Sequence, residues 1–595
     1  MAVVSRCLPP ALLLGLSVLT ACGGNSNSGV SLPPPPPPQF PPQAVTLNFL
    51  GRFSTGQFDA GAAASLSWYG EAKQALVANR AANRVDVLSL STPASPQRIA
   101  QIDASGDAAT ALGHALGQVS AVAVFDAFGS VTDKDRIAVT VLGIAVDAPG
   151  AVAIYNASDR SLITVLATGV GPGAVSFSQD GQFVITADAG EPAADYSVDP
   201  EGSISVVNLS PVPTPPATTA PPSISVLGFA EFNVTGITPI PTTSRESEIL
   251  PGVRVIEKPA PLPVATRAQD FEPKSVSTGV NARAYVSLQK NNAFATVALL
   301  PARIESILPF GTRDYNVPGN SLEASDLNNP PVLRNQPVKG YFQPGAIAVF
   351  RNNVEVLILT ANTGAPRVLP SFDERARVAD LTLDPVVFPN AAELQQATNL
   401  GRLQVSATEG NAAATSTVPA DADHEALLAY GTRSFSIFRV TGTIANDSAN
   451  DFERITAERL GSNFNSAANA NGSGGSRSDD SGPAPSALAL GQIDGATFAF
   501  IGLHEVGGIM VYALDNNLLT PRFIDYKTER NFNVPVATAD TNGDGFADTN
   551  PEVGDLGPDS MVFVPISASP TADSLLIVGN SVSGTTSVYA VRPSP

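Results

Sequence analysis

A short pattern of apolar and polar residues recurs along the chain. An apolar run rich in β-branched and aromatic residues ends in a small polar step, a few residues turn back, and a second apolar run follows. Runs of this length and composition are typical of β-strands joined by tight turns. At least five copies are present, at residues 75–80 with 85–88, 183–190 with 203–207, 284–291 with 294–297, 498–504 with 508–512, and 575–581 with 585–589.

Irregularly spaced copies of one β unit predict radial repetition with insertions in the loops, because each small sheet can bury its faces only against its neighbours. We therefore predict an all-β fold, a single β-propeller. Dividing about 550 residues among seven blades gives about 79 residues per blade, which is long beside the roughly 40 to 50 of compact blades. The prediction is a seven-bladed ring with long insertions, although the arithmetic also admits six or eight blades.

Two stretches of biased composition lie inside the predicted ring. Residues 210–263 are rich in Pro and Thr, and residues 461–486 are rich in Gly, Ser and Asn. Neither stretch can bury enough apolar surface to form a core of its own. We predict both as long loops between strands, where such loops either contribute to function or are tolerated insertions.

The composition agrees with many short strands and turns. The chain contains 51 Pro and 49 Gly, with 43% hydrophobic and 15% charged residues. Its 34 Lys and Arg against 54 Asp and Glu give a net charge of -20. No basic run is present, so we expect no nucleic acid partner. The acidic excess fits an extracytoplasmic protein that uses divalent cations, and equally a surface that negative charge simply keeps solvated.

The N-terminus predicts a lipoprotein. Arg6 precedes the apolar residues 11–21, which are too few to span a bilayer and are followed by small residues, as in a secretory signal peptide. Residues 19–23, Leu-Thr-Ala-Cys-Gly, resemble a bacterial lipobox. We predict cleavage before Cys22 and lipidation of its thiol, with an ordinary soluble signal peptide as the alternative. The mature domain then contains no disulfide.

The chain divides into three predicted parts. Residues 1–21 are the lipoprotein signal peptide, 22–44 a Gly/Ser/Pro-rich linker, and 45–595 the propeller domain. The proline run at 33–38 predicts an extended spacer of about 3.1 Å per residue that holds the domain off the membrane. Gly23 after the cysteine is similar to the pattern of outer-membrane lipoproteins. We expect a monomer, anchored by lipid to the membrane of a bacterial cell envelope, at the outer membrane.

Several sequence blocks resemble the choice-of-anchor I family and occur in the family's order from about residue 45 to the C-terminus. They lie at residues 171–203, 270–273, 341–348, 430–437, 451–456, 477–483, 554–558 and 582–586. The resemblance implies a YVTN/WD40-like, seven-bladed propeller on secreted or surface-anchored proteins whose members differ in how they attach. Some similar sequences carry the name alkaline phosphatase, and others resemble a mesenchyme-specific cell surface glycoprotein. The resemblance implies a fold more directly than a function.

The chain departs from the family pattern at the ends of the repeated strands, where the family usually has a glutamate. If such glutamates ring the centre and hold Ca²⁺, which takes six to eight oxygen ligands, most of that ring is missing here. The departure puts a family-wide catalytic activity in doubt for this chain. The corresponding positions are Ala189, Lys290, Thr363, His504 and Ser581.

Acidic residues remain grouped in two loops. Convergence of the loops on one face would create a surface that binds Ca²⁺ or polarises a phosphoryl group. The alternative is that they are solvated. The acidic residues are Glu191, Asp195, Asp199 and Glu201 in one loop and Asp270 and Glu272 in the other. A deciding observation is whether a wider acidic set shares one cavity, namely Glu191, Asp199, Glu272, Asp326, Glu453, Asp479 and Asp559.

One segment has the spacing of a calcium loop. Oxygen side chains stand at positions 1, 3, 5 and 9, a glycine at position 6 allows a sharp turn, and a backbone carbonyl is available at position 7. The bidentate glutamate of position 12 is missing, since Pro551 stands there. We predict a structural Ca²⁺ that ties a long loop to the propeller, with a polar, turn-rich insertion as the alternative. The predicted ligands are Asp540, Asn542, Asp544, Phe546 and Asp548.

The sequence contains few residues in the arrangements of known catalytic motifs. The three histidines are widely separated and show no HExxH spacing, and neither a Gly-x-Ser-x-Gly nor a Walker-type loop occurs. Residues 423–425, Asp-His-Glu, read either as an acid/base cluster or as a histidine at the start of a strand that hydrogen-bonds its neighbours. We favour the second interpretation, for His424 and also for His504 beside Glu505.

Two functions therefore compete. The first is a lipid-anchored, non-catalytic binding or scaffold module with an unknown protein or glycan partner. It follows from the lack of a complete catalytic constellation. The second is a calcium-dependent alkaline phosphatase or phytase-like phosphoric ester hydrolase. It follows from the names in the family and from the remaining acidic loops.

Overall fold

The computed structural model describes residues 43–127, 134–210, 220–233, 245–256, 265–411, 423–514 and 519–594. Residues Pro41–Pro595 form one compact unit. The predicted signal peptide, Cys22 and nearly all of the predicted linker lie outside the described residues.

The described residues form seven antiparallel sheets of four strands each. In chain order of their innermost strands, the sheets consist of β2 (Ser65–Tyr69), β3 (Gln74–Asn79), β4 (Arg84–Ser89) and β5 (Gln97–Ile102); β6 (Val119–Phe125), β7 (Arg136–Val141), β8 (Pro149–Asn156) and β9 (Leu162–Val170); β10 (Pro172–Phe177), β11 (Phe183–Asp188), β12 (Ser203–Asn208) and β13 (Ser223–Gly228); β14 (Pro273–Gly279), β15 (Arg283–Leu288), β16 (Ala293–Leu299) and β17 (Ala302–Pro309); β20 (Ala346–Arg351), β21 (Val356–Ala361), β27 (Phe435–Arg439) and β28 (Ile444–Asp447); β29 (Pro485–Ile493), β30 (Ala496–Leu503), β31 (Ile509–Leu514) and β32 (Pro521–Lys527); and β35 (Pro558–Val564), β36 (Ser574–Asn580), β37 (Thr585–Ser594) and β1 (Ala44–Ser54).

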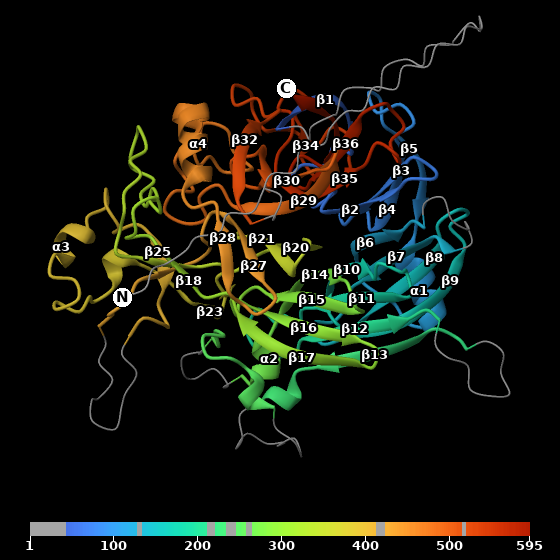
Figure 1. The fold of residues 1–595 in the computed structure, drawn as a ribbon, viewed down its shortest axis with the longest axis horizontal. Helices are drawn as coiled ribbons and strands as arrows, with labels where there is room; N and C mark the ends of the chain where they lie inside the picture. The colour runs from blue at the N-terminus through green and yellow to red at the C-terminus, as the bar shows by residue number, and fades with distance from the viewer. Residues whose placement is uncertain are drawn as a thin grey trace, which may run out of the picture. The chain divides into compact units, whose positions relative to one another are not determined.

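The innermost strands of the sheets contact one another in a closed cycle. β2 contacts β6, and the cycle continues through β10, β14, β20 and β29 to β35, which contacts β2 again. Figure 1 shows these strands grouped around a common centre. A closed ring of small sheets is a β-propeller, so the all-β prediction is confirmed.

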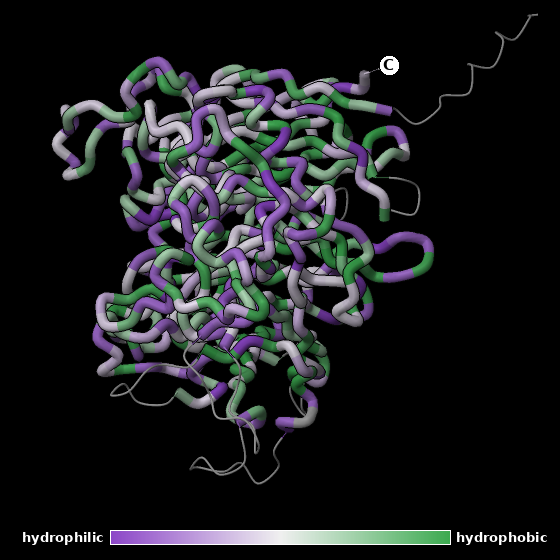
Figure 2. Tube along the Cα trace, turned by 90° about the vertical axis from the view of Figure 1, so that its left-hand side faces the viewer, coloured by the Kyte–Doolittle hydropathy of each residue, from purple (hydrophilic) through white to green (hydrophobic). Residues whose placement is uncertain are grey.

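The recurring sequence pattern corresponds to the second and third strands of five sheets. β3 with β4, β11 with β12, β15 with β16, β30 with β31, and β36 with β37 occupy the predicted pairs of segments. These strands are buried along nearly their whole length because neighbouring sheets cover both of their faces. Outer strands such as β5 and β13 are largely exposed. Figure 2 shows short hydrophobic and hydrophilic stretches that alternate along the chain.

The two ends of the described chain close the ring in one sheet. β1 pairs with β37 from Ala44 opposite Ser594 to Ser54 opposite Thr585. The sheet therefore takes its outermost strand from the N-terminal side and its other three strands from the C-terminal side. Hydrogen bonds between chain ends hold such a ring shut, because no edge is left between the first and last sheets.

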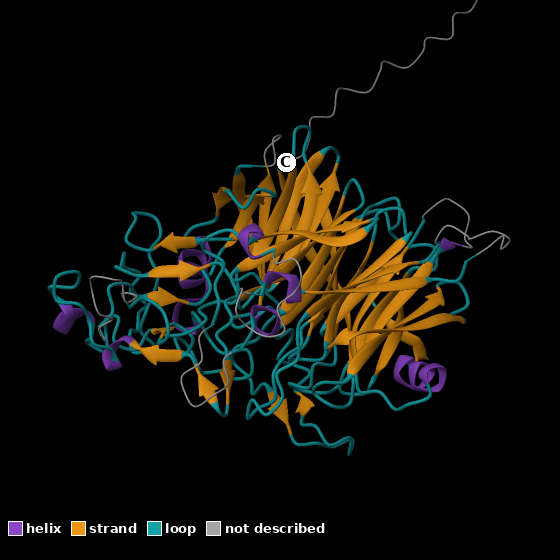
Figure 3. Cartoon of the chain, turned by 90° about the horizontal axis from the view of Figure 1, so that it is seen from below, coloured by secondary structure: helices purple, strands orange, loops and turns teal. Residues whose placement is uncertain are grey.

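A large insertion separates β21 from β27. It contributes to a five-stranded sheet with its own apolar cluster, which includes Tyr315, Val378, Leu400 and Val405. The sheet stands apart from the strands of the ring (Figure 3). Its strands are β18 (Thr312–Asp314), β19 (Lys339–Tyr341), β26 (Leu428–Ala429), β25 (Gln404–Ser406) and β24 (Arg375–Arg377).

The remaining elements are short. The strand pairs are β22 (Val368–Leu369) with β23 (Phe372–Asp373) and β33 (Ala537–Thr538) with β34 (Asp548–Thr549). The helices are α1 (Ala104–Leu112), α2 (Arg267–Asp270), α3 (Ala391–Leu394), α4 (Asp451–Leu460), η2 (Ala230–Phe232), η3 (Glu246–Glu248), η4 (Val378–Asp380) and η5 (Gly461–Asn463).

The two stretches of biased composition differ from the prediction of simple loops. The Pro/Thr-rich stretch supplies β13, the outer strand of a sheet, and the short helix η2. The Gly/Ser/Asn-rich stretch is tightly packed, with Asn465, Ser466 and Ser478 fully buried. Small polar residues can pack in this way when their hydrogen bonds are met internally. Composition alone did not reveal those partners.

Candidate functional site

The innermost strand of each sheet begins at the same end of the ring at which the second strand ends. Pro172 lies opposite Asp188, Pro273 opposite Leu288, and Pro558 opposite Asn580. We call this end the axial rim. Proline suits the first position of such a strand, because the missing N–H removes no ladder hydrogen bond there. The residues that follow the second strands, Arg80, Lys290, Thr363, His504 and Ser581, therefore all lie at the axial rim.

A buried ion-pair cluster lies beside the rim. Arg367, 2% exposed, donates from one nitrogen to Asp270 Oδ1 at 2.7 Å and from another to Glu272 Oε1 at 2.5 Å. Lys290 Nζ lies 2.6 Å from Glu272 Oε2 and 3.5 Å from Glu191 Oε1. Burial alone would lower the pKa of Arg367, but Glu272 and Asp270 raise it. The guanidinium is therefore charged and is matched by buried carboxylates.

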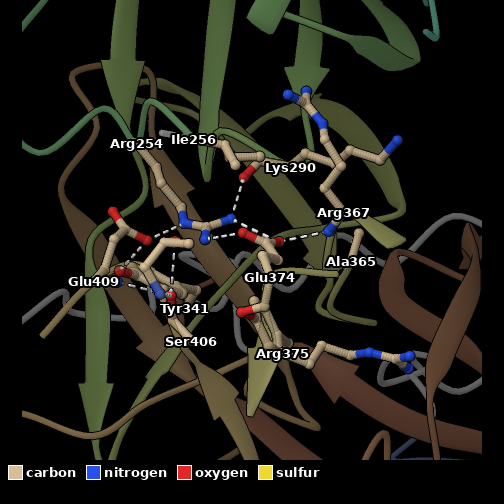
Figure 4. Close-up of polar contacts among 12 residues, drawn as sticks. Arg254, Ile256, Lys290, Tyr341, Ala365, Arg367, Glu374, Arg375, Ser406 and Glu409 are labelled. Carbon is tan, nitrogen blue, oxygen red and sulfur yellow. Dashed lines mark hydrogen bonds and ion pairs between the residues drawn. The ribbon is translucent and has the colours of Figure 1, made fainter. Parts of the chain in front are cut away.

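A second cluster joins two insertions next to the first (Figure 4). The buried side chain of Arg254 forms ion pairs with Glu374 and Glu409. Tyr341 donates to Glu409 Oε2 at 3.0 Å, and its ring centroid lies 5.1 Å from the Arg254 guanidinium carbon. Arg254 also donates to the carbonyl oxygen of Lys290 at 3.2 Å. The segment 245–256 and the insertion after β21 are thus fastened to each other at the axial rim.

The first two clusters share a carboxylate. The backbone N–H of Arg367 donates to Glu374 Oε1 at 2.5 Å, while Glu374 itself is 0% exposed. Tyr430 donates to the carbonyl oxygen of Glu374 at 3.0 Å. A buried polar network of this kind is stable when its members have partners, and it then holds its loops in one arrangement.

A histidine and an aspartate form a third contact across two sheets. His504, directly after β30, has Nδ1 at 2.8 Å from Asp559 Oδ1 on β35, and Ser581 donates to the same carboxylate. Burial disfavours the charged imidazole, but Asp559 outweighs this and raises the pKa of His504 to about 9. The prediction that His504 bonds its sequence neighbours was wrong. Its partner comes from the next sheet, which a strand pattern does not reveal.

The structure brings together half of the predicted acidic face. Glu191, Asp270 and Glu272 meet around Lys290 and Arg367. The rest lie elsewhere: exposed Asp195 accepts from Ser197, Asp199 accepts from Gln269 through its backbone carbonyl, and Glu201 is exposed.

The wider acidic set is distributed over separate ion pairs. Glu453 pairs with Arg433 at 2.7 Å, and Asp479 with Arg377 at 2.7 Å. Asp326 pairs with Arg402. Arg402 also lies 3.6 Å from Asp479 and so contacts both aspartates. Each of these carboxylates thus has a guanidinium partner, and the set is not a common ring of free carboxylates. The sequence pattern could not show these partners because none is a close neighbour in the chain.

The predicted calcium ligands lie together in an exposed loop between β33 and β34. Asp540 accepts from the N–H groups of Gly543 at 2.7 Å and Gly545 at 3.0 Å. Asn542 donates to Asp548 Oδ1 at 2.9 Å, and Asp544 accepts from the N–H of Phe546 at 3.0 Å. The donor set consists of oxygens, as Ca²⁺ requires. The base of the loop bonds to the segment after β1, where Phe58 donates to the carbonyl of Ala547 at 2.9 Å.

The environment of His424 differs from the prediction that its side chain hydrogen-bonds its neighbours: both ring nitrogens are buried and have no hydrogen-bond partner among the described residues. His424 is 5% exposed, and its backbone forms bridges with Leu383 and Asn411. Burial lowers the pKa of His424. Carboxylate oxygens of its neighbours Asp423 and Glu425 lie with one from Asp384 within 4.8 Å of one another. His424 thus lies four residues before β26 and bonds its surroundings through its backbone and not through its imidazole.

Comparisons with known proteins find a family profile and a curated relative. The profile of a family described as Choice-of-anchor I domain matches residues 65–517. Gigasin-3a of Magallana gigas is 30% identical over 198 residues, which are 32% of this chain and 65% of Gigasin-3a. The chain thus spans less than two thirds of that relative.

Similar solved structures include Streptogramin B lyase, with a TM-score of 0.39, 8% identity, and coverage of 93% of this chain and 100% of the other. Saccharomyces cerevisiae Sqt1 has a TM-score of 0.39, 8% identity, and coverage of 92% and 100%. Because the scores and identities are low, these similarities say nothing about what this chain binds or does. Among the described residues, no helix has the length and apolar character needed to cross a membrane.

Proposed function

Because the chain belongs to the choice-of-anchor I domain family and is a β-propeller module of the cell surface, we propose that it is a lipid-anchored, non-catalytic binding module of the bacterial cell envelope. The proposed anchor is the lipidated thiol of Cys22, and the proposed location is the outer membrane. The loops that border the axial rim form the binding face. The partner is a protein or a glycan.

One observation carries the non-catalytic part of the proposal. The carboxylates that a metal-dependent hydrolase would need at the rim are held by basic side chains: Asp270 and Glu272 by Arg367, and Glu272 also by Lys290. A hard cation needs several anionic oxygens free of such partners. Replacing these ion pairs with a metal would leave a guanidinium buried beside a cation, which is electrostatically unfavourable.

The second part of the proposal is a structural Ca²⁺ held by the loop from Asp540 to Asp548. Its support is the donor set of carboxylate, amide and carbonyl oxygens and the position of the loop. Strand β34, at the end of the loop, lies next to residues 56–58, which follow β1. A cation bound here would fasten the loop to the sheet that closes the ring. It would supply charge neutralisation and no chemistry.

Assays on chromogenic phosphate monoesters and diesters test the non-catalytic proposal, with and without Ca²⁺. We expect no turnover above the uncatalysed rate in either condition. The matched comparison is Glu191→Ala, which removes the exposed acidic partner of Lys290. Calcium-dependent turnover that Glu191→Ala abolishes would replace the binding module with a phosphoric ester hydrolase.

A further inference from the structure

Five of the innermost strands carry the same irregularity one residue after their start at the axial rim. In each, the register with the second strand skips one residue, which is a β-bulge. A bulged residue has no partner opposite it, and bulges commonly aim a side chain at a functional site. The bulged residues are Ser120, Gly173, Lys274, Ser486 and Asp559.

These equivalent positions differ in what their side chains do. Ser120 donates to the carbonyl of Pro172 at 2.5 Å and Ser486 to that of Pro558 at 2.8 Å, so both hydroxyls bond the next sheet. At Gly173, a Cβ would meet only one atom within 4 Å, at 3.9 Å, so this position faces open space. Lys274 is exposed. The rim is therefore lined by bulged residues, and at some of these positions no side chain fills the space.

Charged groups on sheets that are not neighbours influence one another at this rim. Burial raises the pKa of Asp559 on β35, but His504 lowers it more strongly, so that the pKa is below its usual value. Lys274 on β14 also contributes to this lowering. Two or more sheets separate these strands in either direction around the ring. Arg80, after β3, is likewise affected by Asp559 and by Glu191. Strand register also places Arg80, directly after β3, and Lys274, one residue into β14, at this same rim.

Two cations at the rim lack a carboxylate at ion-pair distance. Among the described residues, no ion pair involves Arg80 or Lys274, whereas Lys290 and His504 each have one. Arg80 uses Nε and one terminal nitrogen to donate to the carbonyl of Ser120, at 3.3 and 3.1 Å. A guanidinium has five N–H donors, so three remain. Arg80 is exposed, so these donors are accessible to a ligand.

We propose that the axial rim binds an oxyanion, a carboxylate, sulfate or phosphate group, between Arg80 and Lys274. The guanidinium is suited to a planar or tetrahedral oxyanion because parallel N–H donors can reach two of its oxygens. The ammonium of Lys274 adds a point charge from the other side of the ring. The overall charge of -20 makes such a local cationic pair selective, since most of the surface repels anions.

This inference deepens the proposed binding function and rests on it, by giving the chemical class that the rim recognises. The proposed ligand is an anion, whereas a metal-dependent site would bind a cation. Glu191 and Asp559, the acidic groups near the two cations, are already bonded to Lys290 and His504. An incoming anion would therefore compensate Arg80 and Lys274 without displacing an existing ion pair.

Calorimetric titration of the purified chain with inorganic phosphate, sulfate and acetate at low ionic strength tests the proposal. We expect saturable binding of at least one anion that weakens with added salt. Arg80→Gln and Lys274→Gln should each weaken it roughly tenfold or more, since a charge-assisted contact is lost. The control is Arg303→Gln, an arginine of the outer strand β17 whose side chain is 61% exposed; it should bind as the wild type does.

Two results would overturn the proposal: no saturable binding of any of the three anions, or binding that neither rim variant weakens. The urea midpoint of each variant shows whether it is folded, and Lys274→Glu serves as a second test because exposed Lys274 has no ion-pair partner to lose. Inorganic anions contain no ester bond. Turnover in the ester assays would thus remove the non-catalytic proposal and leave this one standing.

Discussion

Replacing Arg367 with methionine is the sharpest test of the ion-pair cluster. The variant keeps an apolar stem of similar length and removes the guanidinium that lies 2.7 Å from Asp270 and 2.5 Å from Glu272. Asp270, 0% exposed, would retain only the donors of Asn291 and Ile256. Removing one partner of a buried pair leaves an uncompensated charge and costs about 3–5 kcal/mol.

The hydrogen bonds of Arg367 give a similar value for the stability that the variant loses. Arg367 makes one charge-assisted hydrogen bond to each of two carboxylates, and bonds of this type contribute about 1.5–3 kcal/mol each. The matched control is Arg375→Met, eight positions away. Arg375 pairs with Asp373 at 2.7 Å, but both side chains are partly exposed, at 33% and 44%. Exposed pairs contribute about 0–1 kcal/mol, so this variant should be nearly neutral.

Urea unfolding followed by the fluorescence of Trp68, the single tryptophan, measures these differences. A double variant, Arg367→Met with Asp270→Asn, separates the causes. It removes the orphaned charge of Asp270, while Glu272 keeps its ion pair with Lys290, so it should recover most of the lost stability. Two outcomes would refute the reasoning: an Arg367→Met midpoint equal to that of Arg375→Met, or a double variant no more stable than the single one.

Two further predictions follow from the rim and the acidic loop. Since the pKa of His504 is raised to about 9, above an unfolded value of about 6.5, its pairing stabilises the fold fully below about pH 6.5 and the stability is lost as pH rises through about 9. The free energy of unfolding of the wild type, measured with urea, should therefore exceed that of His504→Gln by on the order of 2 kcal/mol near pH 6. A difference in free energy that stays constant from pH 6 to 10 would contradict this assignment. Calorimetric titration with Ca²⁺ should give heat in the wild type and in Asp494→Asn, an exposed turn residue, but not in Asp540→Asn or Asp544→Asn; equal heats in all four proteins would exclude the calcium site.

The fold could be predicted largely because propeller sheets bury their middle strands on both faces. Those strands become short apolar runs with a fixed polar ending, which is visible in a single sequence. The pattern failed for two sheets. β7 and β8 are joined by residues 142–148, which are mostly apolar and hide the turn, and the insertion at residues 362–434 separates β21 from its partner β27.

The five-stranded sheet was not predicted for a related reason. Its strands are two or three residues long, and β19 pairs with β26 in parallel although the two are far apart in the chain. Such pairing is determined by tertiary contacts and not by local periodicity. The apolar residues that form its core, among them Tyr315 and Leu400, are scattered among polar ones.

Strand-end positions could be predicted, but their partners could not. The repeated pattern correctly places Lys290 and His504 after second strands, yet their carboxylate partners come from a different loop or a different sheet. The pairing of Arg367 with Asp270 spans 97 positions of the chain. Strand pairing and the packing of adjacent sheets make these groups neighbours, so charge counts within one loop mislead. The acidic loops resembled a metal site because the basic residues that neutralise them lie elsewhere in the sequence.

The residues that stand at the five strand ends also account for how the rim is held together. Thr363 donates to the carbonyl of Pro485 at 2.5 Å and Ser581 to that of Gly557 at 3.3 Å, so the two hydroxyls bond the start of an innermost strand. Lys290 and His504 neutralise carboxylates. A glutamate at any of these four positions would leave a carbonyl or a carboxylate facing a negative charge, which is unfavourable without a cation. The strand-end side chains are thus satisfied by protein groups, and this leaves Arg80 and Lys274, the rim cations for which the described residues supply no ion pair, to contact the proposed anion.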